Sequence, residues 1–379
     1  MNNFFCAGVF ALGLLSACGK GASAPAGDIS SFRAGDNIPV TRAACTPFGD
    51  VPRSIVPVAN DLIQQTCLPD GAAMPAWSDA DGTARTACLY EPSSAASDHK
   101  LPLIIYIHPS AVTSDFALFG SQLLSSQATA DLSGDPARPG FILVAPEGRT
   151  TDHFYPTPDD NAPGWDNWYR QFDPLRNVNG TDFSTNVDAA TIDHFAQEAI
   201  DRGSVDTSRI YVMGWSNGSA MGILYSLNRP FVAAAAVYSA PNPFGAFNDP
   251  CTQDAVKNFP VSDLQNQVSN PGVPIYHLHN ACDVGGICPN GLAMRDQLHA
   301  AGVAEVDDVI IDNTLAQVGA CDDSCGTNPL ADYGGVQDPS GYFVNAPGYT
   351  LGLVNHLRWP TSWTSEMFAY LRAHPQAAR

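Results

Sequence analysis

Apolar runs of strand length alternate along this chain with segments of helical periodicity. Strands are expected at 103–107, 141–145, 209–213, 233–238, 273–278, 306–311 and 349–354. Helices are expected at 186–202, 216–227, 292–301 and 361–374. This alternation predicts an α/β fold with a mostly parallel central sheet and helices on both faces. Hydrophobic residues make up 45% of the 379 residues, which is enough to bury a substantial core. We expect one domain over 45–379, whose first part forms antiparallel edge strands of the sheet.

The pentapeptide Gly214-Trp215-Ser216-Asn217-Gly218 stands between an expected strand and an expected helix. A sharp turn at Ser216 requires small residues two positions to either side, and glycine occupies both positions. The positive end of the following helix would lie beneath the site where negative charge develops. This placement is typical of the nucleophile in α/β-hydrolases. We therefore predict Ser216 as a nucleophile, the alternative being a serine in an incidental glycine-rich turn.

A serine hydroxyl needs a general base to become nucleophilic. In this fold an acidic residue and then a histidine follow the serine along the chain, each in a loop after a later strand. His356 follows the expected strand 349–354 and precedes the last helix, so we predict it to be the base. Asp283 follows the expected strand 273–278 by a short loop, so we predict it to orient the imidazole.

Other titratable residues near strand ends are weaker candidates for the general base and for the orienting acid. His277 and His279 alternate along one strand, from which we expect that they do not both point to one site and are structural. Asp307 and Asp308 come too early in the next strand to reach the base.

Two backbone amides are candidates for the oxyanion hole. The first is the N–H of Asn217, directly after the nucleophile. The second lies in the loop His108-Pro109-Ser110 after the first parallel strand. Proline has no N–H to donate, so Ser110 is the candidate, and His108 is expected to stabilise the loop.

Aromatic residues gather in the segments around the predicted site. Trp215, Trp165 and Trp359 are candidates to line the substrate surface, with packing in the core as the alternative for each. The segment 149–185 is long and aromatic, and segments of this kind are usually functional or disordered.

The N-terminus has the features of an export signal. Residues 4–15 form an apolar run that is too short to span a membrane. The following Leu15-Ser16-Ala17-Cys18 resembles the lipobox of bacterial lipoproteins, which implies a signal peptide over 1–17 and lipidation of Cys18. Residues 18–44 would then be a flexible tether, and the chain would be exported and held at the cell envelope by its lipid anchor. Ordinary cleavage to a soluble exported form is the alternative.

The eight cysteines that follow Cys18 fit an exported protein. In an oxidising compartment they allow up to four disulfides, whose pairing the sequence leaves open. No metal site and no cofactor are expected. A net charge of −20 argues against nucleic acid as a partner, because a polyanion would be repelled, and is compatible with a neutral substrate. The oligomeric state is left open.

Several motifs together resemble the poly(3-hydroxybutyrate) depolymerase and feruloyl esterase group of α/β-hydrolases, over roughly 100–373. The resemblance lies in Val205-Asp206, Arg209-Ile210-Tyr211-Val212, the serine pentapeptide, His279-Asn280-Ala281-Cys282-Asp283 and His356-Leu357-Arg358-Trp359-Pro360. It implies a triad of Ser216, Asp283 and His356. The chain departs from the group at Pro109 and Asn280, where the group usually has glycine.

Within that group the chain resembles hydrolases of oxidized polyvinyl alcohol. This resemblance implies cleavage of the carbon–carbon bond of a β-diketone through an acyl-enzyme, giving a carboxylic acid and a methyl ketone. An esterase or depolymerase acting on polyhydroxyalkanoate or feruloyl esters is the first alternative. A lipoprotein that uses the same fold only for binding is the second.

Overall fold

The computed structural model describes residues 41–44, 56–57, 65–79, 84–152, 163–165, 170–173, 187–241, 270–280, 290–311, 336–337, 343–344 and 356–376. The predicted signal peptide, Cys18, Asp283 and the expected strand 349–354 lie outside these ranges.

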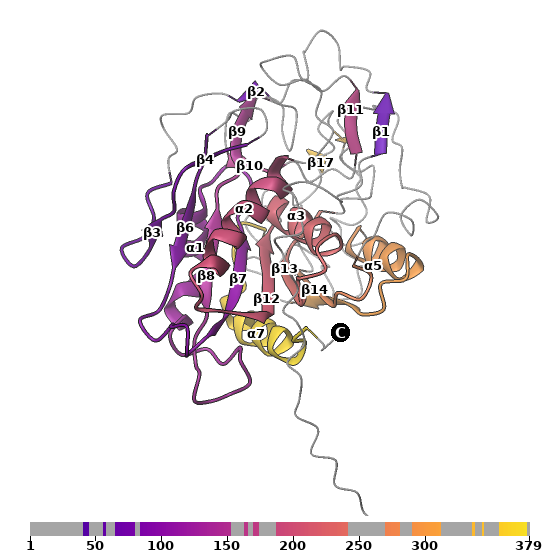
Figure 1. The fold of residues 1–379 in the computed structure, drawn as a ribbon. Coiled ribbons are helices and arrows are strands. Elements are labelled where there is room, and N and C mark those ends of the chain that lie inside the picture. Colours follow the sequence, from indigo (N-terminus) through magenta and orange to yellow (C-terminus); the bar gives the residue numbers. More distant parts are fainter. Residues whose placement is uncertain are drawn as a thin grey trace, which may run out of the picture.

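An eight-stranded sheet forms the centre of the described structure (Figure 1). Its order is β15-β14-β13-β12-β7-β8-β6-β3. The strands are β3 (Ala72–Ala73), β6 (Ala87–Tyr90), β7 (Leu101–Ile107), β8 (Ile142–Pro146), β12 (Val205–Trp215), β13 (Ala234–Tyr238), β14 (Ile275–Asn280) and β15 (Val306–Ile311). Neighbours from β15 to β8 run parallel, whereas β6 and β3 are antiparallel to their neighbours. The mostly parallel sheet and the antiparallel strands at its N-terminal edge are therefore confirmed.

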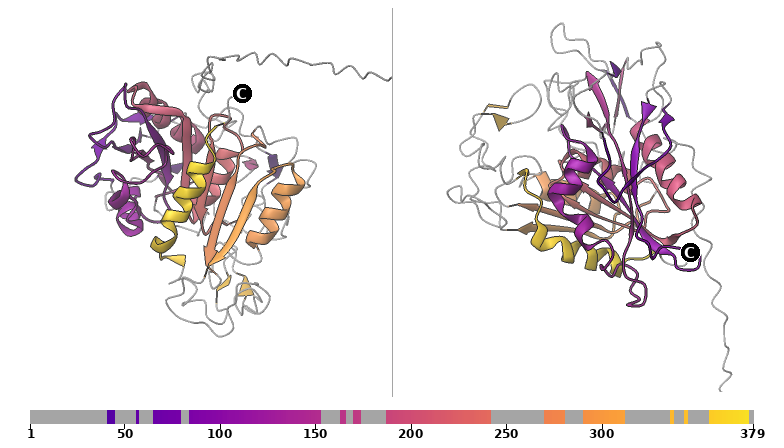
Figure 2. Two further views of the ribbon diagram at one scale, coloured as in Figure 1. Left: turned by 90° about the horizontal axis from the view of Figure 1, so that it is seen from below. Right: turned by 90° about the vertical axis from the view of Figure 1, so that its left-hand side faces the viewer.

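Helices cover both faces of this sheet (Figure 2). They are α1 (Ser114–Ser121), η2 (Leu123–Ser126), α2 (Val187–Asp201), α3 (Asn217–Ser226), α5 (Asn290–Ala300), η4 (Thr361–Trp363) and α7 (Thr364–Ala373). Alternate residues of β7 belong to different cores, with Ile105 on the face of α2, α3 and α5 and Ile104 on the face of α1 and α7. Because successive side chains of a strand point to opposite faces, an unbroken apolar run is what a strand buried on both sides requires.

Two segments differ from the expected boundaries by more than two residues. The expected strand 209–213 begins earlier, at Val205, because Val205 pairs with Leu101 and Ile210 with Leu103, leaving a bulge of polar residues between them. The expected tether extends to residue 44, but Thr41–Ala44 form β1, which pairs in parallel with β11 (Arg170–Asp173).

Short pairings complete the described structure. Their strands are β2 (Val56–Pro57), β4 (Trp77–Ser78), β5 (Ala84–Arg85), β9 (Arg149–Asp152), β10 (Pro163–Gly164), β16 (Val336–Gln337) and β17 (Phe343–Val344). A disulfide between Cys67 and Cys88 joins the segment before β3 to β6. This is one pair from the eight cysteines for which disulfides are expected.

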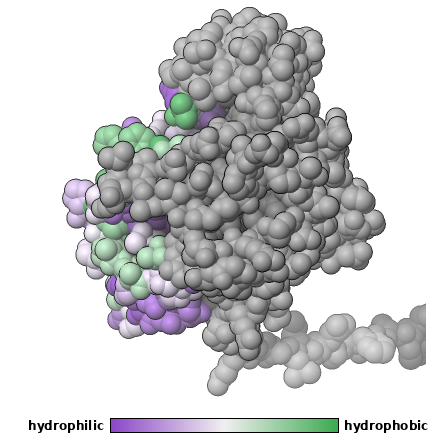
Figure 3. Space-filling view, turned by 90° about the horizontal axis from the view of Figure 1, so that it is seen from above, coloured by the Kyte–Doolittle hydropathy of each residue, from purple (hydrophilic) through white to green (hydrophobic). Residues whose placement is uncertain are grey.

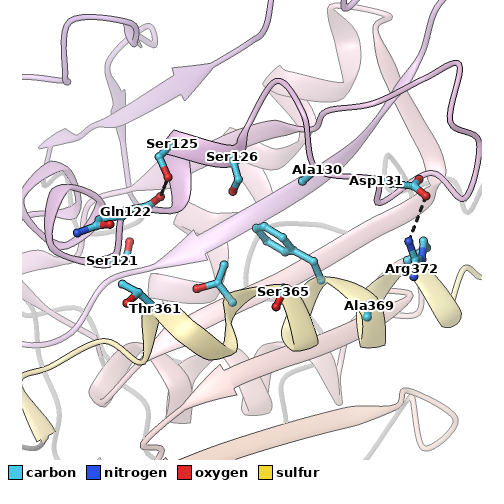
Figure 4. Close-up of a pocket in the computed structure, with 12 residues that line it drawn as sticks. Ser121, Gln122, Ser125, Ser126, Ala130, Asp131, Thr361, Ser365, Ala369 and Arg372 are labelled. Carbon is cyan, nitrogen blue, oxygen red and sulfur yellow. Dashed lines mark hydrogen bonds and ion pairs between the residues drawn. The ribbon is translucent and has the colours of Figure 1, made fainter. Parts of the chain in front are cut away.

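The described surface mixes hydrophobic and hydrophilic residues on the face seen in Figure 3. A cavity of about 540 Å³ lies between η2 and α7, lined largely by serine and threonine, with Arg372 reaching Asp131 across it (Figure 4). None of its lining residues belongs to the predicted site. Within the described ranges, no helix combines the length and apolar character needed to cross a membrane.

A buried ionic cluster ties the edge of the sheet to α2. The Arg85 guanidinium donates to Asp79 Oδ2 at 3.0 Å, to Asp188 Oδ1 at 2.6 Å and to the Glu147 carbonyl at 3.3 Å. All three charged side chains are buried. A buried cation shared by two carboxylates is costly to remove, because the carboxylates remain in a medium that solvates them poorly.

Replacing Arg85 by methionine is expected to lower the free energy of unfolding by about 3–5 kcal/mol, because the two buried carboxylates lose their shared guanidinium. Urea unfolding monitored by tryptophan fluorescence measures the change. The matched control is Arg295→Met, which removes a partly exposed arginine paired with its neighbour Asp296 and is expected to change stability by no more than about 0.5 kcal/mol. Equal effects of the two substitutions would contradict a structural role for the cluster.

Candidate active site

Ser216 occupies a strained turn between β12 and α3. Its φ of 54° and ψ of −123° lie in a region that residues with a side chain rarely adopt. The Ser216 N–H donates to the Tyr238 carbonyl at 2.9 Å, which fixes the turn against the end of β13. The serine thus sits where the central strand ends and α3 begins, at the N-terminus of that helix.

Glycine at positions 214 and 218 is required by close backbone packing. A Cβ at Gly218 would lie 2.2 Å from the Ile107 carbonyl oxygen, and one at Gly214 would lie 2.6 Å from the Gly218 carbonyl oxygen. Both distances are too short for a carbon atom. Gly218 therefore allows α3 to approach the end of β7, and Gly214 allows the first turn of α3 to approach β12, as expected of a nucleophile on a strand-to-helix turn.

His356 lies within hydrogen-bonding distance of the nucleophile. Its Nε2 is 2.7 Å from Ser216 Oγ, although 140 residues separate the two in sequence. The Trp215 indole N–H donates to the His356 carbonyl at 3.0 Å, so the residue before the nucleophile also holds the backbone of the base. In this geometry His356 can take the proton of the serine hydroxyl.

The other imidazole nitrogen contacts a residue that the sequence analysis did not identify. His356 Nδ1 lies 2.8 Å from Oγ of Ser239, the residue directly after β13. Since β13 is the parallel neighbour of β12, the ends of the two strands meet at the same edge of the sheet. A polar residue at that strand end was the available signal. Asp283, the predicted orienting acid, lies outside the described residues.

The side chains of Asn217 and Ser110, whose backbone amides are the predicted oxyanion donors, both lie near Gly164. A Cβ at Gly164 would lie 3.7 Å from Asn217 Oδ1 and 4.0 Å from Ser110 Oγ. The Asn217 side chain accepts from the Trp165 N–H at 2.8 Å and donates to the Trp165 carbonyl at 3.1 Å. These two hydrogen bonds hold the start of α3 against the segment 163–165. The Pro163 carbonyl of this segment accepts a hydrogen bond from the Ala111 N–H.

His108 stabilises the loop 108–110 after β7, as expected. We call this loop the oxyanion loop because it carries the second predicted oxyanion donor. Its Nδ1–H donates to the Pro109 carbonyl at 2.7 Å, and its Nε2 accepts from the Gly148 N–H at 2.8 Å. Burial lowers the pKa of His108 to about 4, so the imidazole is neutral at neutral pH. A neutral ring with one donor and one acceptor matches both contacts.

The tryptophans predicted to line the substrate surface are largely buried. Trp165 is fully buried and donates its indole N–H to the His108 carbonyl at 2.9 Å, and Trp359 is 2% exposed. For these two residues the burial favours the alternative interpretation, which is packing within the core. Trp215 is 6% exposed and packs edge-on against Trp359, with ring centroids 5.8 Å apart.

His277 and His279 were expected not to point to one site, and this is wrong. Residues two apart in a strand project from the same face. Nδ1 of His277 lies 2.7 Å from Oδ1 of Asp308, and Nε2 of His279 lies 3.1 Å from Oδ2 of the same carboxylate. Their structural role is consistent with the hydrogen bond from the Ala240 N–H to His277 Nε2 at 3.1 Å.

These three side chains have the types and spacing of metal ligands, since their donor atoms lie within 4.8 Å of one another. The Ala240 N–H, however, donates to Nε2 of His277, so in the neutral ring the proton resides on Nδ1, the atom that would have to bind the metal. The cluster therefore fits a hydrogen-bonded network around a carboxylate better than a metal site.

The sheet order and the serine turn define the fold as that of an α/β-hydrolase. Neither the models of known protein families nor the sequences of curated proteins match the chain. Among solved structures, a thermostable esterase is similar at 16% identity and a TM-score of 0.40, covering 69% of this chain and 60% of its own. A Pyrococcus horikoshii acylaminoacyl peptidase is similar at 13% identity and a TM-score of 0.41, covering 65% and 38%. A ferulic acid esterase is similar at 12% identity and a TM-score of 0.41, covering 76% and 98%.

This chain thus spans less than two thirds of the length of the thermostable esterase and of the acylaminoacyl peptidase. The assignment of the fold depends on the chain's own sheet and its own serine turn.

A buried carboxyl group lies behind the oxyanion loop. Glu147 Oε2 accepts from the Ser114 N–H at 3.0 Å, and Oε1 lies 3.6 Å from His108 Nε2. Burial raises the pKa of Glu147 to about 8, against the opposing effect of the hydrogen bonds from Ser114. The group is therefore largely protonated at neutral pH.

A raised pKa in the folded state makes stability fall as the pH rises. Between the ordinary glutamate pKa and a pH of about 8, Glu147 is expected to cost ~1.4 kcal/mol of unfolding free energy per pH unit. Glu147→Gln, which stays neutral, should therefore gain stability relative to the unmodified chain as the pH rises from 5 to 8. Urea unfolding across this range measures the difference, with the exposed Glu366→Gln as control. A difference that is constant with pH would show that Glu147 is ionised throughout.

Proposed function

We propose that this chain is a serine hydrolase that works through an acyl-enzyme on Ser216. The observation that carries the proposal is the 2.7 Å approach of His356 Nε2 to Ser216 Oγ on a strained strand-to-helix turn. Strain of this kind persists where the surrounding structure imposes it, and it is concentrated at functional sites.

The reaction proceeds in two halves. Ser216 Oγ attacks a carbonyl carbon of the substrate, and its proton passes to His356 Nε2. The N–H groups of Asn217 and Ser110 stabilise the oxyanion, each such donor being typically worth roughly 3 kcal/mol. His356 then gives its proton to the leaving group. Water, deprotonated by the same histidine, releases the acyl group as a carboxylic acid, and Asp283 is the residue we expect to orient the imidazole.

For the substrate we propose a β-diketone of oxidized polyvinyl alcohol, on the resemblance described above. The bond between the attacked carbonyl carbon and the central carbon breaks, its electron pair passes into the second carbonyl as an enolate, and protonation yields a methyl ketone. Together with the water consumed, one diketone gives one carboxylic acid and one methyl ketone. A neutral substrate is compatible with the net charge of −20.

Exposed apolar side chains support a substrate with apolar surface. Phe116 and Phe119, three residues apart on α1, are 64% and 73% exposed, and Leu357, directly after the base, is 61% exposed. A Cβ at Gly120 of α1 would lie 3.9 Å from the Trp215 ring, and Trp215 contacts His356. The exposed residues therefore belong to segments that adjoin the site.

Ser216→Ala is expected to lower kcat about a million-fold, because the serine and its base act as one unit. Hydrolysis of a chromogenic ester measures kcat, and a fluorophosphonate should label the unmodified chain but not the variant. Ser226→Ala, which removes a buried hydroxyl from α3 far along the helix, is the control. A loss below tenfold would place the nucleophile elsewhere, and absence of labelling would favour a binding protein.

A substrate panel separates the diketone from the ester proposal. Purified protein is offered acetylacetone-like diketones, oxidized polyvinyl alcohol, polyhydroxybutyrate and methyl ferulate, and the products are identified by mass spectrometry. We expect a carboxylic acid and a methyl ketone from the diketones. Fast ester cleavage without any diketone turnover would replace this assignment by a secreted esterase.

A further inference from the structure

Ser239 is held in a backbone conformation that serine seldom adopts. It follows β13 directly, is fully buried and has a φ of 59°, in the left-handed region. Its N–H donates to the Leu278 carbonyl of β14 at 2.7 Å. Glycine would suit this turn better, so the presence of a side chain here calls for a reason.

The residue after Ser239 is anchored as well. The Ala240 N–H donates to Nε2 of His277, whose Nδ1–H donates to Asp308 on β15. Burial acts to raise the pKa of Asp308, but hydrogen bonds from His277 and His279 outweigh it and hold the pKa well below its usual range. An ionised carboxylate therefore fixes His277, and His277 fixes the turn on its far side.

The side chain of Ser239 points to the base. Its Oγ lies 2.8 Å from His356 Nδ1, while His356 Nε2 lies 2.7 Å from Ser216 Oγ. The imidazole thus bridges two serine hydroxyls. To accept the proton of Ser216, Nε2 must be unprotonated, so the ring proton lies on Nδ1 and is donated to Ser239 Oγ.

We propose that Ser239 is a positioning residue for His356. Its hydroxyl accepts the Nδ1–H, holds the ring plane and favours the tautomer whose Nε2 faces the nucleophile. The inference rests on the proposed function, because it assigns Ser239 a role through the base of that reaction. A neutral hydroxyl orients the imidazole without supplying the negative charge that a carboxylate gives to the imidazolium. The carboxylate expected of Asp283 would therefore share the Nδ1–H with the hydroxyl in a three-centre hydrogen bond.

Ser239→Ala removes the hydroxyl and keeps the Cβ. We expect kcat to fall by about 10- to 100-fold, as for a misplaced catalytic group, with KM unchanged because the hydroxyl acts through His356. The downfield proton resonance of His356 Nδ1–H, identified by its loss in His356→Gln, should shift or broaden. A purely structural role would not produce this combination.

The control is Ser226→Ala, which removes a buried hydroxyl that donates to the Gly222 carbonyl and does not touch the base. Ser239→Gly serves as the second variant, since glycine tolerates the turn and also lacks the hydroxyl. Equal losses of kcat in Ser239→Ala and Ser239→Gly support the proposal, even if the alanine variant is unstable. Wild-type kcat and an unshifted resonance in Ser239→Gly overturn it. An active Ser216→Ala would instead refute the proposed function itself, so the two failures are distinguishable.

Discussion

The close approach of α3 to the end of β7 is the constraint on which the site depends. At Gly218 a methyl group would fall 2.2 Å from one carbonyl oxygen and 2.3 Å from the next, at Ile107 and His108. Only a residue without a side chain allows this contact. Because the contact is made by backbone, it brings the N-terminus of α3 and the loop after β7 together independently of side-chain rotamers. Ser216, the proposed nucleophile, and the loop that carries the second proposed oxyanion amide therefore belong to one rigid unit.

Buried groups behind this unit keep it in place. His108 joins the loop after β7 to Gly148, which follows β8, and the carbonyl of Glu147 receives the guanidinium of Arg85. Arg85 in turn binds Asp188 on α2. A continuous path of hydrogen bonds thus runs from a helix on one face of the sheet to the oxyanion loop. Rigidity of this kind is what preorganised electrostatic stabilisation requires, since donors that must reorient at the moment of reaction contribute less.

Much of the fold and the core of the site follow from local sequence signals. Unbroken apolar runs such as that of β7 predict a doubly covered strand, and glycine on both sides of Ser216 predicts the sharp turn. His356 could be placed because it stands between a strand pattern and the last helix. The sequence alone does not predict the contact of Ser239 with the base, because that contact depends on which strands are neighbours in the sheet. Because residues two apart in a strand share a face, His277 and His279 of β14 reach the same carboxylate, that of Asp308, and the expectation that they point apart is wrong. Trp165 is buried among residues distant in sequence, with its backbone bonded to Asn217 and its indole N–H to His108, 52 and 57 residues away.

The chemistry that separates an ester from a β-diketone lies in the leaving half of the substrate. Both substrates present a carbonyl to the same nucleophile and the same two amides, so the acylation machinery serves either. An ester expels an alkoxide whose charge sits on one atom and needs the proton of His356 as it departs. A diketone expels an enolate whose charge spreads to the second carbonyl oxygen, so a hydrogen-bond donor facing that oxygen stabilises the transition state of this substrate alone. In the proposed reaction, selectivity for carbon–carbon cleavage therefore depends on a donor to the second carbonyl oxygen and not on the proposed nucleophile and base.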